Sequence, residues 1–266
     1  MTLTTDFGLR DPYVAEMKAV ILNICPTATI IDITHQVDPF NVRMGAYVLA
    51  TAANYFPRDT IHVAVVDPGV GTERRPLLLQ TQQSFFVGPD NGLLLLAAEQ
   101  QGVVCIREIT NTRLMNSNVS NTFHGRDVFA PAAAHLANGV SPTDFGSETH
   151  RAVKPSFVNV TLRDGNLIGE ILHIDNFGNV ITNITAEHMM QIGTTDALHI
   201  ELAHQKLKLK FCKTYAEAKL HQPLALIGSQ GYFEIAVNKG SAARKFNLKP
   251  GDKIKISATP PRTQPT

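Results

Sequence analysis

Two segments contain residue types that could activate a water molecule together. In Asp67-Pro-Gly-Val-Gly-Thr-Glu-Arg74, a guanidinium follows a carboxylate by seven residues across a glycine-rich turn. In Thr122-Phe-His124-Gly-Arg-Asp127, a histidine lies just before a predicted helix. Because Asp and His accept protons while Arg stays cationic, Asp67, Arg74 and His124 could orient water and stabilise developing hydroxide. The same residues also fit a structural ion pair and a histidine near a helix N-terminus, and their spacing alone leaves both interpretations open.

Several further polar residues directly follow predicted strands. Asp6 follows the first strand, His35 and Asp38 follow the second, and Asp90-Asn91 follow a later one. In open α/β sheets, ligands bind beyond the carboxyl ends of the strands. Each residue alone is typical of a turn or a helix cap, but several of them at one sheet edge predict a binding site there.

Familiar cofactor and metal motifs are absent from the sequence. The segment that starts at Gly69 begins like a dinucleotide-binding fingerprint, but it ends in Arg74 and lacks the third glycine. The candidate metal ligands include no pair at the spacing of a helical metal site. We therefore expect neither a cofactor nor a metal ion. The candidate ligands considered are Asp6, His35, Asp67 and His124.

These residues need elements that position them, and the first half of the chain alternates predicted strands and helices. The run 61–66 is apolar nearly throughout, which is typical of a strand covered on both faces. We predict an α/β domain with a largely parallel central sheet over residues 1–152. Its predicted strands are 28–33, 61–66 and 84–87, and its predicted helices are 14–24, 42–55, 93–101 and 127–137.

After residue 155 the pattern changes to short strand-like runs that are separated by turn signals such as Arg163-Asp-Gly165. This spacing predicts a smaller all-β, barrel-like C-terminal domain. We assign residues 153–160 to a linker, 161–258 to the β domain and 259–266 to a frayed tail. The predicted strands are 158–162, 169–174, 180–184, 198–202, 206–211, 224–227, 233–237 and 253–256.

The composition limits the class of protein. Of 266 residues, 44% are apolar and 18% are charged, as in a globular protein of one or two domains. The net charge of +1 gives no global field that attracts nucleic acid or an acidic membrane. Residues 1–150 carry 9 basic and 14 acidic residues, whereas residues 151–266 carry 15 and 9. These opposite charges fit either solvated faces that differ or halves that touch, within one subunit or between subunits.

The spacing of the cysteines and the length of the apolar runs predict the cellular compartment of the protein. Cys25, Cys105 and Cys212 are odd in number and widely spaced, which is typical of reduced, buried thiols. The first residues resemble neither a signal peptide nor a transit peptide, and no apolar run reaches about 18 residues. We expect a cytoplasmic protein that binds neither nucleic acid nor a membrane.

Seven motifs occur in order across nearly the whole chain, and together they resemble the S-adenosyl-L-methionine (SAM) hydroxide adenosyltransferases. This family of SAM hydrolases is related to the fluorinase and chlorinase, which attack the same substrate with halide. One motif alone would be a weak signal, whereas the ordered set spans both predicted domains. The motifs are Thr5-Asp6-Phe-Gly8, Pro39-Phe40, Asp67-Pro-Gly-Val-Gly-Thr-Glu-Arg74, Pro89-Asp-Asn-Gly92, Phe123-His-Gly-Arg-Asp127, Ile174-Asp-Asn-Phe-Gly-Asn179 and Ser229-Gln-Gly-Tyr232.

The resemblance implies a reaction in which water or hydroxide attacks the ribose C5′ of SAM, giving adenosine and L-methionine. The sulfonium is already a good leaving group, so the enzyme must supply an aligned, poorly solvated nucleophile. By motif match, Asp67, Arg74 and His124 are the implied catalytic triad. Arg74, rather than Arg75, keeps the family's spacing from the aspartate.

The resemblance also implies contacts to the nucleoside. Asp6 matches the carboxylate that holds the ribose hydroxyls, and Phe40 takes the place of an aromatic residue near the ribose. Phe177 and Asn179 match residues around the adenine, and Asn238 lies where the chain approaches the same base. Without the resemblance, we would interpret Asp175-Asn-Phe-Gly178 as a hairpin turn and Phe177 as a core residue.

Contacts to the methionine end follow from the same motifs. Asp11 and Asp175 match acidic residues around the ammonium, and Ser229 matches a contact to the carboxylate. The halogenases carry an arginine where this chain has Gln230, and Tyr13 replaces a small hydroxyl residue. Recognition of the carboxylate is therefore the part of the implied site that departs most from the family pattern.

Other departures concern the nucleophile. Gly125 replaces the serine that meets fluoride in the fluorinase, His124 replaces a tyrosine, and a long insertion after the Asp67 region is missing. These differences imply water rather than halide as the nucleophile. Two alternatives stay open at this point: a halide-using synthase of 5′-halo-adenosine, and a module that binds SAM or adenosine without turnover.

The family builds a homotrimer with the substrate between the α/β domain of one subunit and the β domain of its neighbour. The resemblance implies the same assembly here. Such a head-to-tail contact must close into a ring, which three-fold symmetry allows. The opposite charges of the two halves are compatible with that arrangement.

Overall fold

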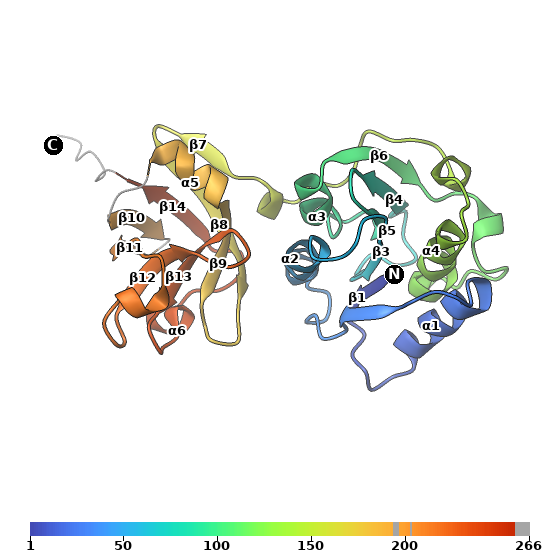
Figure 1. Cartoon of the computed structure of the whole chain (residues 1–266), viewed down its shortest axis with the longest axis horizontal. Coiled ribbons are helices and arrows are strands. Elements are labelled where there is room, and N and C mark those ends of the chain that lie inside the picture. Colours follow the sequence, from blue (N-terminus) through green and yellow to red (C-terminus); the bar gives the residue numbers. More distant parts are fainter. Residues whose placement is uncertain (194–196, 203, 259–266) are drawn as a thin grey trace. The chain divides into compact units, whose positions relative to one another are not determined.

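The computed structural model describes residues 1–193, 197–202 and 204–258. The chain divides into two compact units, Met1–Pro155 and Ser156–Thr266 (Figure 1). The predicted tail, 259–266, lies outside the described residues. Within the described ranges, no helix is long and apolar enough to cross a membrane.

The first unit is built on a six-stranded sheet with the order β2-β1-β3-β5-β4-β6. Its neighbouring strands β2, β1, β3 and β5 run parallel, and β4 and β6 add two antiparallel pairings at one edge. The prediction of an α/β unit with a largely parallel sheet is confirmed. The strands are β1 (Thr2–Thr5), β2 (Ile31–Thr34), β3 (Ile61–Val65), β4 (Pro76–Thr81), β5 (Phe85–Pro89) and β6 (Val103–Glu108).

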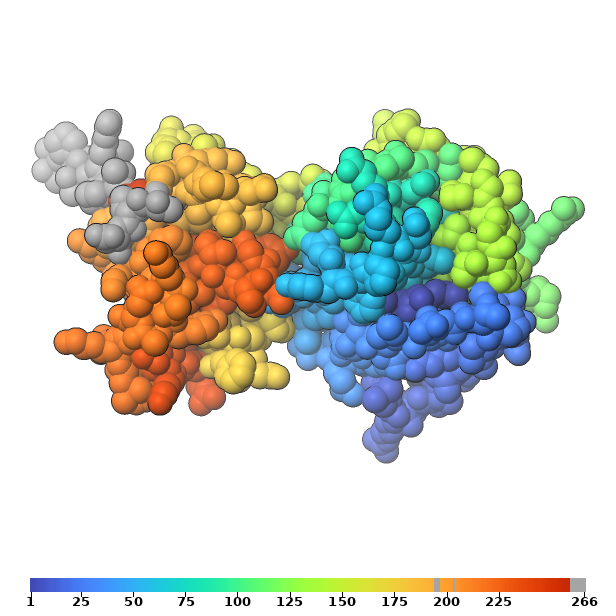
Figure 2. All heavy atoms as spheres, viewed as in Figure 1, coloured from blue at the N-terminus to red at the C-terminus, as the bar shows by residue number. Residues whose placement is uncertain are grey.

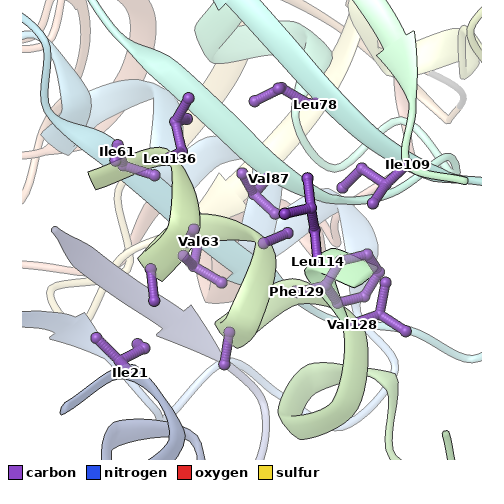
Figure 3. Packing of buried hydrophobic residues seen from close by; sticks show 14 of the residues in the cluster. Ile21, Ile61, Val63, Leu78, Val87, Ile109, Leu114, Val128, Phe129 and Leu136 are labelled. Carbon is purple, nitrogen blue, oxygen red and sulfur yellow. The ribbon is translucent and has the colours of Figure 1, made fainter. Parts of the chain in front are cut away.

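Helices cover both faces of this sheet. On one face, α1 (Tyr13–Ile24) and α4 (Ala130–Ala137) pack on the sheet around Val63 and Val87 (Figure 3). Figure 2 shows the surfaces of these two helical regions side by side, blue and yellow-green, although they are far apart in the sequence. On the other face, α2 (Val42–Ala53) packs closely against its neighbours because Gly45 has no side chain. A Cβ at Gly45 would lie 2.7 Å from Cδ1 of Leu93. Next to α2 lies α3 (Leu95–Gln100).

Some elements of the first unit differ from the predictions. The strands β4 and β6 are not among the predicted strands, because periodicity alone does not distinguish a short apolar run from part of a buried helix. The predicted helix over 127–137 begins earlier, as a π-helical turn, Gly125–Phe129, that leads directly into α4. Short 3-10 helices occupy Thr112–Leu114 and Pro142–Phe145.

The second unit is an antiparallel, nearly barrel-shaped sheet with the order β11-β10-β14-β8-β9-β13-β12, and β7 pairs with β8. The two end strands meet, because Phe211 bridges Ala225 and the Cys212 N–H donates to the Ala225 carbonyl at 2.8 Å. The predicted barrel-like domain is confirmed. The strands are β7 (Thr161–Arg163), β8 (Asn166–Ile174), β9 (Val180–Thr185), β10 (Ala197–Leu202), β11 (Gln205–Lys210), β12 (Pro223–Ile227), β13 (Tyr232–Val237) and β14 (Lys253–Ser257).

This second unit also contains helices that the all-β prediction omitted. Helix α5 (Ala186–Ile192) starts at a capping box formed by Thr185 and His188, and Ser241 caps the short α6 (Ala242–Phe246). The predicted strand 158–162 is instead a 3-10 turn, Ser156–Val158, followed by β7. A further 3-10 helix spans Tyr215–Glu217.

The three cysteines are free thiols. Cys25 and Cys212 are buried, as predicted, whereas Cys105 is only partly buried because β6 lies at the edge of its sheet.

Candidate active site

A cavity of about 530 Å³ opens in the first unit at the carboxyl ends of β1 and β3. This is the sheet edge at which parallel strands present ligand-binding residues. Its lining combines carboxylates, a histidine and several aromatic rings. The lining residues are Asp6, Phe7, Tyr13, Glu16, Pro39, Phe40, Val65, Asp67, Val70, Ser120, Thr122, Phe123, His124, Gly125 and Arg126.

The predicted triad is assembled at this cavity around a single guanidinium. Arg74 Nε donates to Oδ1 of Asp67 at 3.1 Å, and Nη2 of Arg74 donates to Oδ2 of the same carboxylate. The Nη2 atom also lies 3.0 Å from Nδ1 of His124. The side chains of Asp67 and Arg74 are only 5% and 6% exposed, so water screens this ion pair weakly. The ring of Phe129 supports the guanidinium from one side, with its centroid 5.3 Å from Cζ.

The contact between Arg74 and His124 fixes the tautomer of the imidazole. A guanidinium has no acceptor, so Nδ1 of His124 must accept and the neutral ring carries its proton on Nε2. Burial lowers the pKa of His124, and the positive charge of Arg74 lowers it further, against smaller opposing effects of Asp67 and Asp127. The neutral form of His124 is therefore the form that this site stabilises.

One donor of the triad has no partner within the protein. Among the described residues, Nη1 of Arg74 is buried and makes no hydrogen bond. A buried N–H without a partner is costly, and in a polar site such a group is available for a ligand or a water molecule.

Asp6 lies on the same wall of the cavity. Its Oδ2 accepts a hydrogen bond from the Phe40 N–H at 2.8 Å. Burial raises the pKa of Asp6 and the nearby charge of Asp67 adds to this, whereas backbone N–H groups oppose it. Phe40 has a left-handed backbone, φ 64°, and its side chain is 71% exposed at the cavity rim. A bulky residue in this conformation is strained, and the bond to Asp6 helps to hold it.

Aromatic rings form another part of the lining. Phe7, Tyr13 and Phe123 contact one another edge to face, with centroids 5.2 to 5.8 Å apart. Arg126 lies over the ring of Phe123, with Cζ 5.1 Å from its centroid. Faces of aromatic rings attract cations, so this wall suits a positively charged ligand.

The guanidinium of Arg126 also connects Glu16 of α1 to Asp127 of the π-helical turn. Its Nη1 donates to Glu16 at 2.9 Å, and its Nε and Nη2 donate to the buried carboxylate of Asp127. Asp127 in turn accepts hydrogen bonds from Asn116 and from the Ser120 N–H, which fixes the loop before His124. The π-helical turn therefore follows directly on His124, which lies at the cavity. Asp127, which is part of this turn, holds the neighbouring loop.

The charges around the cavity are unequal. Among the lining residues, three carboxylates, Asp6, Glu16 and Asp67, outnumber the one guanidinium, Arg126. Arg74 contacts Asp67 from outside the lining and adds one more positive charge, and the site favours the neutral imidazole. The formal sum is negative, so the site favours a cationic ligand over an anionic one.

Not every strand-end residue belongs to the cavity. Asp11 lies in the exposed loop before α1 and is absent from the lining. His35 is buried and bonds through Nδ1 to Thr5 at 2.8 Å, which ties β1 to the segment after β2. Asp90 and Asn91 are also absent from the lining, and they bond to Arg75 and to the Val66 carbonyl.

In the second unit, three predicted residues form one local cluster. Asp175 Oδ1 accepts from the N–H groups of Phe177 and Asn179, and its Oδ2 accepts from the Asn179 side chain, all at 2.9 Å. Gly178 has φ +84°, and a Cβ there would lie 2.1 Å from Oγ of Ser241. This tight turn leaves the Phe177 side chain 79% exposed rather than in a core.

The remaining predicted residues of the second unit lie in turns. Ser229 and Gln230 are exposed between β12 and β13. Asn238 uses its side-chain amide to donate to the Ala218 carbonyl at 2.8 Å. These three residues and the Asp175 cluster lie in a different unit from the triad.

The structure adds lining residues that the sequence analysis did not assign. Phe123 and Arg126 lie within the motif 123–127, so their position beside His124 indicated that they could belong to the site. Glu16 follows Tyr13 by three residues, which places both on one face of α1. For Phe7, its position next to Asp6 is the only feature of the sequence that indicates a place in the site.

Comparisons with known proteins give a consistent result. The model of the SAM hydroxide adenosyltransferase N-terminal domain matches residues 1–146, and the model of the C-terminal domain of the same family matches residues 169–255. A Methanocaldococcus jannaschii protein named (R)-S-adenosyl-L-methionine hydrolase is 40% identical, covering 96% of this chain and 95% of its own. A Salinispora arenicola protein of that name is also 40% identical, with 97% of each chain covered.

More distant relatives and a solved structure extend this pattern. A fluorinase from Actinoplanes is 29% identical over 95% of each chain. The crystal structure of an uncharacterized conserved protein from Thermotoga maritima has a TM-score of 0.87 and 40% identity, and covers 96% of this chain and 99% of its own. Both halves of the chain are thus matched together in proteins of similar length.

Proposed function

The chain belongs to the SAM hydroxide adenosyltransferase family, and we propose that it hydrolyses S-adenosyl-L-methionine to adenosine and L-methionine. One observation carries this proposal: a single buried guanidinium contacts both Asp67 and His124 at a cavity with excess negative charge. The sulfonium of SAM is a cation that such a cavity attracts, and the triad supplies groups that hold water.

The proposed reaction is a direct displacement at C5′ of the ribose. A water molecule lies in the cavity beside Asp67 and His124 and accepts a hydrogen bond from the Nε2–H of His124. Its oxygen forms a bond to C5′ while the C5′–S bond breaks, and the electron pair of that bond returns to sulfur as the thioether of methionine. No acid is needed, because the departing sulfonium becomes neutral.

The proton of the attacking water requires an acceptor. His124 holds its proton on Nε2 and uses Nδ1 for Arg74, so we assign the role of acceptor to Asp67, whose oxygens each keep a lone pair beyond those used by Arg74. Arg74 then stabilises the hydroxide-like charge that develops on the oxygen. His124 acts as a neutral donor through Nε2.

The substrate-binding roles remain part of the proposal. Asp6 binds the ribose hydroxyls through the oxygen that Phe40 leaves free, and the Phe40 ring covers the ribose. The negative cavity and its aromatic wall hold the sulfonium. Further proposed contacts come from Asp11, Asp175, Ser229 and Gln230 to the methionine end and from Phe177, Asn179 and Asn238 to the adenine.

The finer setting of the reaction is also proposed. SAM is the substrate and no cofactor takes part, since the displacement needs no electron acceptor and no group carrier. The active species is a cytoplasmic homotrimer in which the second unit of one subunit completes the cavity of another. The exposed Phe177 supports this part, because a large apolar side chain at 79% exposure gains from a partner surface. Light scattering of the dilute, active protein tests it, and a monomer mass with full activity would disprove it.

Halide as nucleophile is the second candidate, and the packing around Gly125 argues against it. A Cβ at this position would lie 3.1 Å from Cε2 of Phe123 and 3.3 Å from Sδ of Met17. A serine hydroxyl like the one that meets fluoride in the fluorinase would therefore need its neighbours to move. Water, held by the triad, needs no side chain at residue 125.

The deciding experiment is incubation with SAM in ¹⁸O-water, with and without chloride, followed by mass spectrometry of the nucleoside. Adenosine with ¹⁸O at the 5′ position would support hydrolysis by attack at C5′. Halo-adenosine would assign the protein to the halogenases instead. Unchanged SAM with measurable binding would indicate a binding module, and the triad would then be a structural ion pair.

A further inference from the structure

The turn Pro89–Gly92 lies next to the catalytic loop. Strands β3 and β5 run parallel and pair directly. Their carboxyl ends therefore lie at the same edge of the sheet, with Asp67 beyond one strand and Asp90 and Asn91 beyond the other. Neither Asp90 nor Asn91 lines the cavity, so a role for this motif must act through the residues that it contacts.

Asn91 holds the residue that precedes Asp67. Its Nδ2 donates to the Val66 carbonyl at 2.9 Å, and its Oδ1 accepts from the Leu93 N–H at 3.1 Å. Val66 lies beyond the last paired residues of β3, which are Val65 toward β1 and Val63 toward β5. The side chain of Asn91 thus supplies a hydrogen bond where the ladder has ended.

Asp90 holds the residue that follows Arg74. Its buried Oδ2 accepts from Nε and Nη2 of Arg75 at 3.0 and 2.5 Å, and its own N–H donates to the Arg75 carbonyl at 2.9 Å. Its Oδ1 accepts from the Val153 N–H at 2.7 Å. Arg75 is therefore fixed through both its side chain and its backbone.

The two contacts enclose the catalytic loop. Val66 and Arg75 are the residues just outside the segment 67–74, and Asp67 and Arg74 are its first and last members. The interior of this segment contains Gly69 and Gly71, the latter with φ +77°, and glycine restricts the backbone least. Hydrogen bonds within the loop and the ion pair itself hold Asp67 near Arg74, and the contacts at Val66 and Arg75 fix both ends of the segment from outside it.

We propose that Asp90 and Asn91 are positioning residues that hold Asp67 and Arg74 in the geometry needed to orient the attacking water. This inference rests on the proposed function. Misplacement of a reacting group by about 1 Å can cost about 10²-fold in rate. Loss of either contact should therefore lower kcat more than it changes KM, because Asp6 and Phe40, the proposed ribose contacts, lie outside the segment 67–74.

The chain offers a matched control for Asn91. Asn111 also accepts through Oδ1 from the N–H two residues later, Arg113, at 3.1 Å, and donates through Nδ2 to a distant carbonyl, Asp144, at 2.8 Å. It is outside the cavity lining. Asn91→Asp and Asn111→Asp each keep the acceptor and remove the donor, so they make the same chemical change at two places.

The experiment compares steady-state kinetics and thermal unfolding of these two variants with the wild type. We expect Asn91→Asp to lower kcat by about 10- to 100-fold with KM changed less than about threefold. Asn111→Asp should lose similar stability and keep its kcat. An unchanged kcat in Asn91→Asp, or an equal loss of kcat in both variants, would overturn the proposal. Should Asn91→Asp fail to fold, Asp90→Asn keeps the acceptor for Val153, weakens the hold on Arg75 and should give the same split between kcat and KM.

A second readout does not depend on turnover. Arg74 contributes to the lowered pKa of His124, whereas Asp67 and Asp127 oppose it. Displacement of Arg74 in Asp90→Asn should raise that pKa toward its ordinary value, measured by NMR titration of the ring protons, and an unchanged titration would count against positioning. A wild type that yields no adenosine would refute the proposed function, and this titration would still decide whether Asp90 positions Arg74.

Discussion

Nη2 of Arg74 lies 3.0 Å from Nδ1 of His124, so one planar guanidinium bridges the catalytic carboxylate and the imidazole. Its donors contact two different side chains, Asp67 and His124, and among the described residues its Nη1 is buried without a partner. The site therefore uses the planar geometry of the guanidinium as well as its charge. A lysine ammonium keeps the charge but is a single compact point.

Arg74→Lys therefore tests geometry against charge. We expect kcat to fall by roughly 10²-fold, because one ammonium cannot contact both Asp67 and His124 and also hold water. Steady-state adenosine formation measures this. Arg113→Lys, at an exposed arginine outside the cavity, should leave kcat unchanged, and comparable activity in Arg74→Lys and the wild type would refute the assigned role.

The rate should depend on pH through His124. Protonation would place a hydrogen on Nδ1, which then could not accept from Arg74, so the neutral form is the active one. The pKa of His124 is lowered from its ordinary value of 6.5 by burial and by Arg74. Activity should thus fall as the pH falls, with the acid limb of the kcat profile below 6.5. A limb above that value would show that His124 acts in another form.

Asp6→Asn should affect substrate binding more than chemistry. The free oxygen of Asp6 is proposed to accept from the ribose hydroxyls, and a charged acceptor binds hydroxyl groups more strongly than an amide. We expect KM for SAM to rise about tenfold with a smaller change in kcat. The preference for SAM over its 2′-deoxy analogue should shrink in parallel. Asp59→Asn, in an exposed turn, is the control that should alter neither.

Stability should depend on pH through His62, which is remote from the chemistry. This side chain is fully buried, stacks on Phe86 at 4.9 Å and bonds to Thr2 through Nδ1. Burial lowers the pKa of His62 from 6.5 to about 4. The unfolded chain therefore binds a proton first, and stability falls as the pH drops from 6.5 toward 4.

The loss from this one residue is on the order of 3 kcal/mol over the whole window. Urea unfolding at several pH values measures it. In His62→Phe the ring is kept and the titration is removed, so the free energy of unfolding should vary less with pH. An identical pH dependence in this variant would show that other groups account for it.

Much of the fold could be predicted because local patterns agree with the final packing. The apolar run 61–66 became the central strand β3, buried on both faces, and the change of rhythm after residue 155 marks the second unit. The prediction was wrong where the deciding contacts were local side-chain caps. Helix α5, for example, depends on a capping box between Thr185 and His188, and histidine at that position is not a residue that the usual motif specifies.

The site was predictable to a different extent. Residue types and motif spacing indicated Asp67, Arg74 and His124, and the structure brings them together. The contribution of Glu16 could not be predicted, since it depends on how α1 packs against the π-helical turn, a tertiary contact that no local pattern contains. The same holds for the carbonyl of Val66, whose partner is 25 residues away.

The π-helical turn, Gly125–Phe129, directly after His124 sets the direction in which this side chain leaves the helix. Such a turn is an α-helix that has gained one residue, and successive residues of an α-helix are rotated by about 100°. Deleting one residue from this turn would restore a regular helix and swing His124 about a quarter of a circle away from Arg74. The hydrogen bond between these two side chains therefore depends on the extra residue of the turn, and a variant that lacks one residue of this turn would direct Nδ1 of His124 away from Arg74.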